Sequence, residues 1–133
     1  MAQRSVERRL PLPKSHMDFE RAIRSFCGKK EAEAEYLLSI DPSSFPSIFK
    51  EDISHESIST IVGIVRDGGI IQQDADAALR IFVGLTHVKR FAMVSMLMSK
   101  RARQEVGRAL DMLNDAAPDD SRIESLRKAF RCT

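Results

Sequence analysis

The stretch SHESISTIVGIVRDGG, residues 54–69, carries the clearest helical pattern in the chain. Its apolar side chains recur at i, i+3, i+4 and i+7, the spacing of one face of an α-helix. They are Ile58, Ile61, Val62 and Val65. Ser54 can cap the free amide groups of the first turn, and the two glycines can end the helix because glycine adopts positive φ at low cost. The stretch therefore predicts an amphipathic helix with one face against a core.

Two further helices are expected before this one. Ser15 can cap the first helix, which ends near Gly28. One side of this helix carries an apolar stripe that faces the core. The stripe consists of Phe19, Ile23 and Phe26. The second spans residues 29–40, where Leu37 and Ile40 form an apolar edge. The edge expected to face water consists of Glu31, Glu33 and Glu35.

Short helical turns are predicted over residues 42–50. Asp41 can cap them and Pro42 suits a first helical position, so this pair both ends the preceding helix and opens the turns. Their apolar anchors are Phe45, Ile48 and Phe49.

Helical patterns continue after residue 69. Asp74 can cap a helix that ends near His87 and carries Ala78, Leu79, Phe82 and Leu85. Ser99, or a residue just beyond it, opens another that carries Val106, Leu110 and Leu113. The last begins with a capping box, Ser121 at the N-cap and Glu124 at N3, and carries Leu126 and Phe130.

These patterns together predict an all-α fold, a compact bundle of about seven short helices in one domain over residues 15–133. The Arg/Pro-rich residues 1–14 show no helical period and are expected to form a linker or disordered segment outside the core. A chain of 133 residues is long enough to bury a single core. The low content of glycine, proline and aromatic residues argues against a sheet.

Several classes of function find no support in the sequence. The apolar runs fall short of the ~20 residues that a membrane span needs, and no secretory signal is present. Cys27 and Cys132 lie far apart, which suits the reducing cytoplasm or nucleus. The three histidines, expected in surface or capping roles, occupy three different segments. Because no nucleophile, phosphate-binding or metal-binding motif occurs, we expect no catalytic, cofactor-binding or metal-binding residues.

Residues 89–98 predict a helix with apolar residues on more than one stripe. Phe91, Val94 and Met98 lie at i, i+3 and i+7 and make a core face. An adjacent stripe, rotated by about 100°, consists of Arg90, Met93 and Leu97. Either the helix is buried nearly all round, as methionine-rich cores can be, or Arg90 and Met93 stay partly exposed and enter a pocket on another protein.

A cluster of basic residues surrounds the start of the next helix. It consists of Lys100, Arg101, Arg103 and Arg108. It is either a solvated face or a surface for an acidic partner. Nucleic-acid binding through this cluster and the arginines at 4, 8 and 9 is an alternative that the net charge of +2 disfavours. A homodimer through the second stripe is another alternative, but a monomer is expected.

Two motifs resemble a known family. KRFxMxxMxMS, residues 89–99, and DPxxFPxIFK, residues 41–50, are similar to motifs of the C-terminal helical domain of RNA-polymerase-II-associated protein three. Related domains occur in sperm-associated antigen proteins and axonemal-dynein assembly factors. The resemblance covers roughly residues 17–130, and the tetratricopeptide repeats of the long family members are absent.

The resemblance implies a non-catalytic all-α adaptor. In that family the domain docks a co-chaperone onto RuvB-like AAA+ ATPases and bridges them to a heat-shock chaperone, for assembly of multiprotein complexes. It implies partner binding through Arg90 and Met93, and we expect Leu97, Lys89 and Lys100 to take part. A different partner, as in dynein-arm assembly, is the alternative, because Ala92 stands where relatives commonly carry Asp and Lys100-Arg101 replaces an acidic or neutral helix start.

Overall fold

The computed structural model describes residues 11–50 and 53–132, so the arginines at 4, 8 and 9 lie outside it. Within these ranges the chain forms α-helices, one 3-10 turn and no strand, which confirms the all-α prediction. The elements are α2 (His16–Ser25), α3 (Lys30–Leu38), η1 (Pro42–Ser44), α4 (Phe45–Ile48), α5 (His55–Asp67), α6 (Ile70–Gln73), α7 (Ala75–Thr86), α8 (Phe91–Met96), α9 (Lys100–Ala116) and α10 (Ser121–Ala129).

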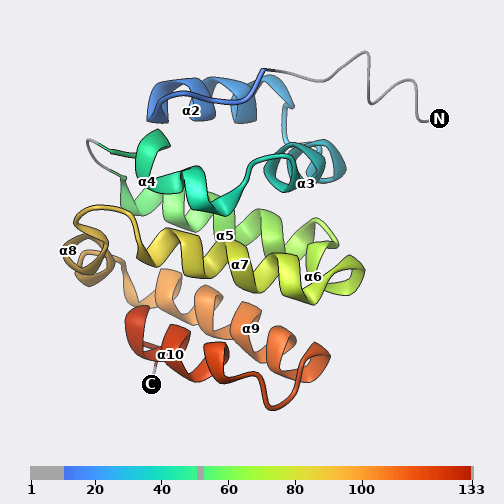
Figure 1. Ribbon diagram of the computed structural model, residues 1–133, viewed down its shortest axis with the longest axis vertical. Helices are drawn as coiled ribbons and strands as arrows, with labels where there is room; N and C mark the ends of the chain where they lie inside the picture. Colours follow the sequence, from blue (N-terminus) through green and yellow to red (C-terminus); the bar gives the residue numbers. More distant parts are fainter. Residues whose placement is uncertain (1–10, 51–52, 133) are drawn as a thin grey trace.

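The helices form successive tiers (Figure 1). The middle tier holds α5, α6 and α7, with α2, α3 and α4 on one side and α9 and α10 on the other. α5 packs against α3 and α9, and α7 packs against η1, α4 and α10. The predicted apolar faces of α5 and α7 are fully buried, so these two helices form the centre of the core.

Predicted caps hold the starts of four helices in place. The side chains of Ser15, Ser54, Asp74 and Ser99 each accept a hydrogen bond from a backbone amide in the first turn of α2, α5, α7 and α9. The predicted capping box of α10 is wrong, because Asp120, one residue earlier, takes the N-cap position and accepts from the Arg122 amide.

Arg122 ties the start of α10 to α7. Its Nη2 donates to Asp76 Oδ1 and to Asp120 Oδ2, both at 2.8 Å. The hydrogen bonds that Asp120 accepts from the side chain and the backbone amide of Arg122 lower the pKa of Asp120 to about 2. Asp120 is therefore both the N-cap of α10 and a member of an ion-pair network, which explains why α10 begins at this point.

The expectation that three glutamates of α3 face water is wrong for Glu33. Its side chain is buried beside Tyr36 and Leu37, with Lys30 Nζ at 3.6 Å from its Oε1. Residues two apart along a helix are rotated by about 200°, so the second of three alternating glutamates lies opposite the other two. An alternating pattern cannot keep to one face of a helix.

Three smaller differences concern the N-terminal half. Pro13, assigned to the segment outside the core, is buried. Ile23 and Phe26 are only half-buried, because α2 lies at the outer edge of the described helices. The short helix α6 was not predicted; it follows directly on Gly69, whose φ of 83° turns the chain between α5 and α6.

Candidate protein-binding site

The helix predicted over residues 89–98 is shorter in the structure. α8 runs from Phe91 to Met96, and Arg90 before it adopts a left-handed conformation with φ of 65°. At the other end the amides of Leu97 and Met98 donate to carbonyls three residues back, which tightens the last turn. The left-handed residue explains the late start, because it cannot continue a right-handed helix.

The inner face of α8 is anchored in the core as predicted. Phe91, Val94 and Met98 are all buried. The Phe91 ring meets the Phe130 ring edge to face, with centroids 5.0 Å apart, which joins α8 to the end of α10. Ser95 is also fully buried and its hydroxyl donates to the Ala92 carbonyl at 2.9 Å. One side of this short helix is therefore fixed by packing.

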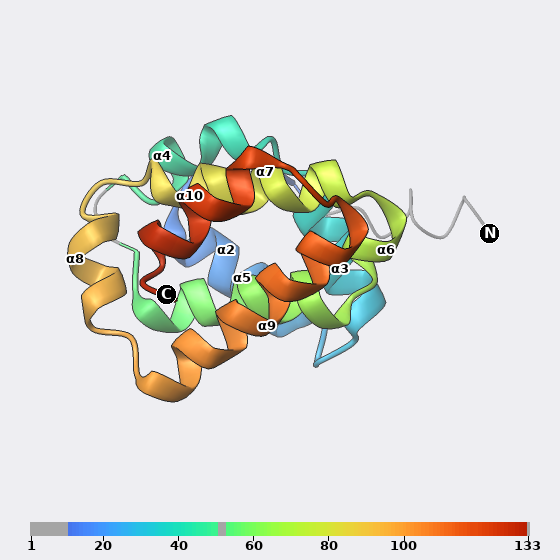
Figure 2. The same ribbon diagram turned by 90° about the horizontal axis from the view of Figure 1, so that it is seen from below.

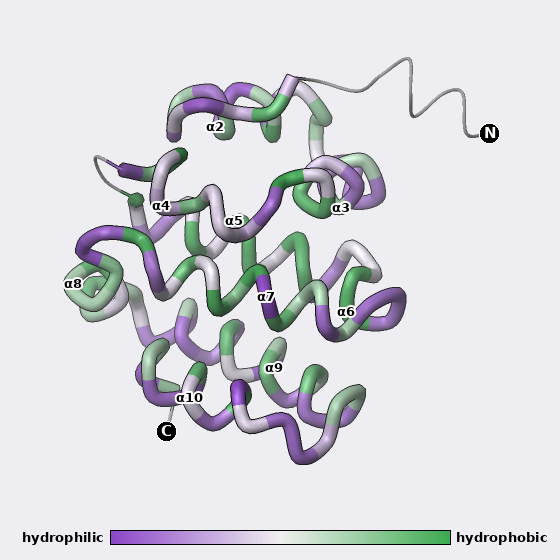
Figure 3. Tube along the Cα trace, in the orientation of Figure 1, coloured by the Kyte–Doolittle hydropathy of each residue, from purple (hydrophilic) through white to green (hydrophobic). Residues whose placement is uncertain are grey.

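The other side of α8 presents three large apolar side chains to solvent. Met93, Met96 and Leu97 are 58%, 57% and 66% exposed. They lie at i, i+3 and i+4, one helical face, which we name the α8 outer face. In Figure 3 the tube of α8 is green although the helix lies at the edge of the molecule, as Figures 1 and 2 both show. The alternative of a helix buried nearly all round is wrong for this side.

Exposed cations flank the α8 outer face along the chain. Lys89 and Arg90 lie in the turn before α8, and Lys100 and Arg101 open α9 after it. Among the residues that the structure describes, no carboxylate forms an ion pair with any of the four. All five residues expected to bind a partner thus lie at α8 or beside it, and all are exposed.

Two residues of this region were not among the expected contacts. Met96 belongs to the α8 outer face, and its spacing from Met93 could have revealed it. Arg103, in the first turn of α9, donates through Nη2 to the Met96 carbonyl at 3.3 Å. Because the contact between Arg103 and Met96 joins two helices, the residue spacing within one helix could not have revealed it.

The far end of the chain packs against the same part of α9. The Cys132 thiol donates to the Arg103 carbonyl at 3.5 Å, and burial raises its pKa. Cys27 is exposed, and both cysteines are free thiols. Cys132 is therefore a packing contact behind α9 rather than an activated nucleophile.

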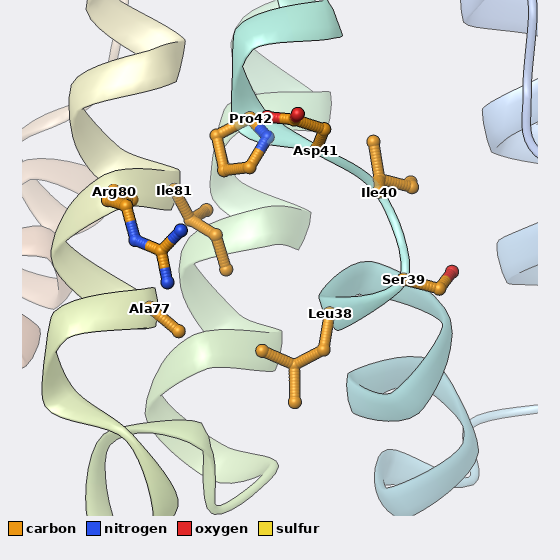
Figure 4. A pocket seen from close by; sticks show the side chains of 8 residues that line it. All are labelled: Leu38, Ser39, Ile40, Asp41, Pro42, Ala77, Arg80 and Ile81. Carbon is orange, nitrogen blue, oxygen red and sulfur yellow. The ribbon is translucent and has the colours of Figure 1, made fainter.

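A hollow of about 300 Å³ lies elsewhere, between the α3–η1 connection and α7. Figure 4 shows Arg80 extending from α7 into it, with Leu38 and Pro42 on the opposite side. The charged groups here already have partners: Arg80 Nε pairs with Asp76 at 2.9 Å, and Ser43 donates two hydrogen bonds to Asp41, which lower the pKa of that carboxyl. The charged groups that line the hollow are therefore already paired within the fold.

The contacts of His16 differ from the surface or capping role that was expected. Its Nε2 lies 2.6 Å from Ser57 Oγ and 3.3 Å from Glu20 Oε2, and its ring packs against Phe49. A catalytic Ser-His-acid arrangement needs the acid on the other ring nitrogen. Because both contacts use Nε2 and Ser57 is buried, His16 joins α2 to α5 structurally.

The described ranges contain neither a cluster of metal ligands nor a membrane-spanning helix. No group of three or more His, Cys, Asp or Glu side chains in them could hold a metal ion. No helix there has the length and apolar character that crossing a bilayer demands.

Comparisons with known proteins agree with the motifs. Over 121 residues the chain is 27% identical to RNA polymerase II-associated protein 3 of Homo sapiens, and over 120 residues 22% identical to that of Mus musculus. Each match covers 90% of this chain but 18% of the relative, so the chain corresponds to a small part of those proteins.

The fold matches a solved structure and a family model. The NMR structure of the C-terminal domain of the human RPAP3 protein superposes with a TM-score of 0.79 at 24% identity, covering 92% of this chain and 90% of that one. The model of RPAP3_C, described as the potential Monad-binding region of RPAP3, matches residues 12–103, which is more than half of the chain. The chain therefore belongs to the RPAP3_C family.

Proposed function

We propose that this chain is a non-catalytic co-chaperone adaptor domain that binds a RuvB-like AAA+ ATPase through the α8 outer face. In this role it serves chaperone-dependent assembly of multiprotein complexes in the cytoplasm or nucleus, with a heat-shock chaperone in the wider complex. The choice of partner rests on the resemblance of the two motifs to the family. The choice of surface rests on the geometry of α8.

The observation that carries the proposal is the exposure of Met93, Met96 and Leu97 together on one helical face. Scattered exposed apolar residues are normal, but a contiguous apolar patch with a polar rim is typical of an interaction site. Methionine is enriched at interfaces because its unbranched, polarisable side chain adapts to a partner pocket. The buried inner face of α8 holds this patch on a packed scaffold, which lowers the entropy lost on binding.

Arg90 is the other main element of the proposed contact. Arginine is enriched among the residues that dominate interface energies. At Arg90 the backbone has a left-handed φ of 65°, which glycine would adopt with less strain. A strained backbone conformation directly before the α8 outer face supports a role for Arg90 in the contact.

Monad is a second candidate partner. The description of the matched family names a potential Monad-binding region, and the matched residues, 12–103, include α8 and its cations. The same surface can serve either protein, so both belong in the binding experiment.

The test is a calorimetric titration of the domain with the purified RuvB-like ATPase and, separately, with purified Monad. Arg90→Ala combined with Met93→Ala should weaken binding at least about tenfold, since each truncated interface anchor typically costs more than about 1 kcal/mol. Met17→Ala combined with Arg24→Ala, two exposed residues of the same types on α2, should leave affinity unchanged.

Two results would contradict the proposal. The ATPase is the wrong partner if the intact domain does not bind it at tens of micromolar while another member of the family does. The site is wrong if the α2 variant, and not the α8 variant, loses binding. Circular dichroism of both variants separates lost binding from lost folding.

A further inference from the structure

The charge of the chain is unevenly distributed around α8. No aspartate or glutamate occurs from residue 77 to residue 104, between Asp76 and Glu105. The same stretch contains Arg80, Lys89, Arg90, Lys100, Arg101 and Arg103. Over the whole chain 21 basic residues nearly balance 19 acidic ones, so this stretch is a local excess of positive charge.

Part of this excess is engaged within the fold. Arg80 Nε pairs with Asp76 at 2.9 Å, and the Arg103 guanidinium donates to the Met96 carbonyl. The other four cations are those already described beside the α8 outer face, exposed and without an ion pair in the described part of the chain. Two precede α8 and two follow it.

We infer that the surface that docks on α8 is an apolar protein pocket whose rim carries carboxylates. This rests on the proposed function and specifies the chemistry of its partner. Met93, Met96 and Leu97 enter the pocket, while Lys89, Arg90, Lys100 and Arg101 face acidic side chains around it. A complementary rim fixes the orientation of the complex and accelerates encounter, because opposite charges steer association.

A protein pocket fits these observations better than a nucleic acid or a bilayer. Single-stranded nucleic acids stack on exposed aromatic rings, and the aromatic residue of α8, Phe91, is buried. Helices that lie in a membrane surface bury a long apolar face, whereas α8 runs only from Phe91 to Met96. Along the chain the exposed apolar residues of α8 lie between two pairs of exposed cations, and such a mixed surface suits a protein partner.

The inference predicts a specific salt dependence. Association of the domain with the RuvB-like ATPase is measured by surface plasmon resonance from about 50 mM to about 500 mM salt, over which the Debye length falls several-fold. The association rate should fall roughly tenfold or more, as expected for steered encounter. Lys100→Gln with Arg101→Gln should lower the rate at low salt and flatten its salt dependence. Arg21→Gln with Arg24→Gln, the same charge change on α2, should not.

An ATPase that binds with a salt-independent rate, and equally well to both variants, overturns this inference and leaves the proposed function standing. An ATPase that does not bind at all overturns the proposed function instead. The acidic rim is then tested with a second probe. A synthetic helical peptide with one leucine face and one glutamate face is titrated into ¹⁵N-labelled domain. Its amide shifts should concentrate in residues 89–101, and the same peptide with lysine for glutamate should cause none.

Equal shifts with both peptides, or shifts elsewhere in the domain, contradict the acidic rim. Duplex DNA and vesicles of phosphatidylserine and phosphatidylcholine complete the test at low salt. Binding of either through residues 89–101, abolished by Lys100→Gln with Arg101→Gln, would assign the surface to that ligand and overturn the inference. Failure of both to bind supports it.

Discussion

The Nη2 atom of Arg103 donates a hydrogen bond of 3.3 Å to the backbone carbonyl of Met96, across the junction of α8 and α9. This carbonyl lies at the end of α8, where helix carbonyls lack intrahelical partners and cations are favoured. The contact fixes the end of α8 from outside, next to two of the three side chains of its outer face. A side chain of α9 thereby helps to orient the proposed binding surface.

Arg103→Met should loosen this junction while keeping the apolar stem of the side chain. We expect a loss of about 1 kcal/mol in the free energy of unfolding, the typical net value of a hydrogen bond. Amide exchange should accelerate at Leu97 and Met98, and partner binding should weaken. Hydrogen-exchange mass spectrometry and chemical denaturation measure these effects. Arg108→Met, at an exposed arginine of the same helix, is the control, and equal effects of both variants would remove the positioning role.

Replacing Arg90 should separate backbone strain from side-chain function. Arg90→Gly should raise thermal stability relative to Arg90→Ala, because a left-handed residue with a Cβ costs roughly 1–2 kcal/mol. Both variants should lose partner affinity to the same degree, since both lack the guanidinium. Retained affinity in either variant would show that Arg90 makes no contact.

The two faces of α8 should respond oppositely to truncation. Phe91→Ala should cost about 3 to 5 kcal/mol of unfolding free energy, because it removes a buried ring that packs on Phe130. Met93→Ala, on the exposed side, should change stability by no more than about 0.5 kcal/mol. Thermal unfolding followed by circular dichroism compares them. A large loss with Met93→Ala would mean that this side chain is packed rather than available.

Gly84 in α7 should be intolerant of a methyl group despite its position within a helix. A Cβ there would lie 2.8 Å from the Pro42 carbonyl oxygen and 2.9 Å from a ring carbon of Phe45. Alanine gains about 1 kcal/mol in helix propensity, and we expect the clash, typically about 1–3 kcal/mol, to exceed it. Gly63→Ala in α5, where no atom lies within 4 Å of the new Cβ, should instead stabilise. Similar denaturation midpoints for the two would refute this packing account.

Local patterns in the sequence predicted much of the fold. Ser54 and Asp74 cap their helices as expected because a cap depends only on residues within one turn. The apolar face of α5 is buried because its spacing matches the helical period. The burial of Glu33 was predictable from the same geometry, since its register places it with Leu37.

The candidate site was less predictable. The pattern of α8 allowed either burial or exposure of Met93, because spacing defines a face but not whether another helix covers it. The left-handed conformation of Arg90 was unexpected, as arginine does not favour it. The contact of Arg103 with Met96 depends on the angle between α8 and α9, which tertiary packing determines.

Methionine footprinting tests the central claim, that the α8 outer face is the docking surface, most directly. Dilute hydrogen peroxide converts exposed thioethers to sulfoxides and is itself reduced to water. Met93, Met96 and Met17 are similarly exposed, at 58%, 57% and 64%, whereas Met98 is buried. In the free domain the first three should oxidise at comparable rates and Met98 slowly. Each site is quantified by mass spectrometry, with and without saturating RuvB-like ATPase or Monad.

The bound partner should slow oxidation of Met93 and Met96 several-fold and leave Met17 unchanged, as expected if the α8 outer face is the docking surface. Protection of Met17 on α2, with Met93 and Met96 oxidised as fast in the complex as in the free domain, would contradict it.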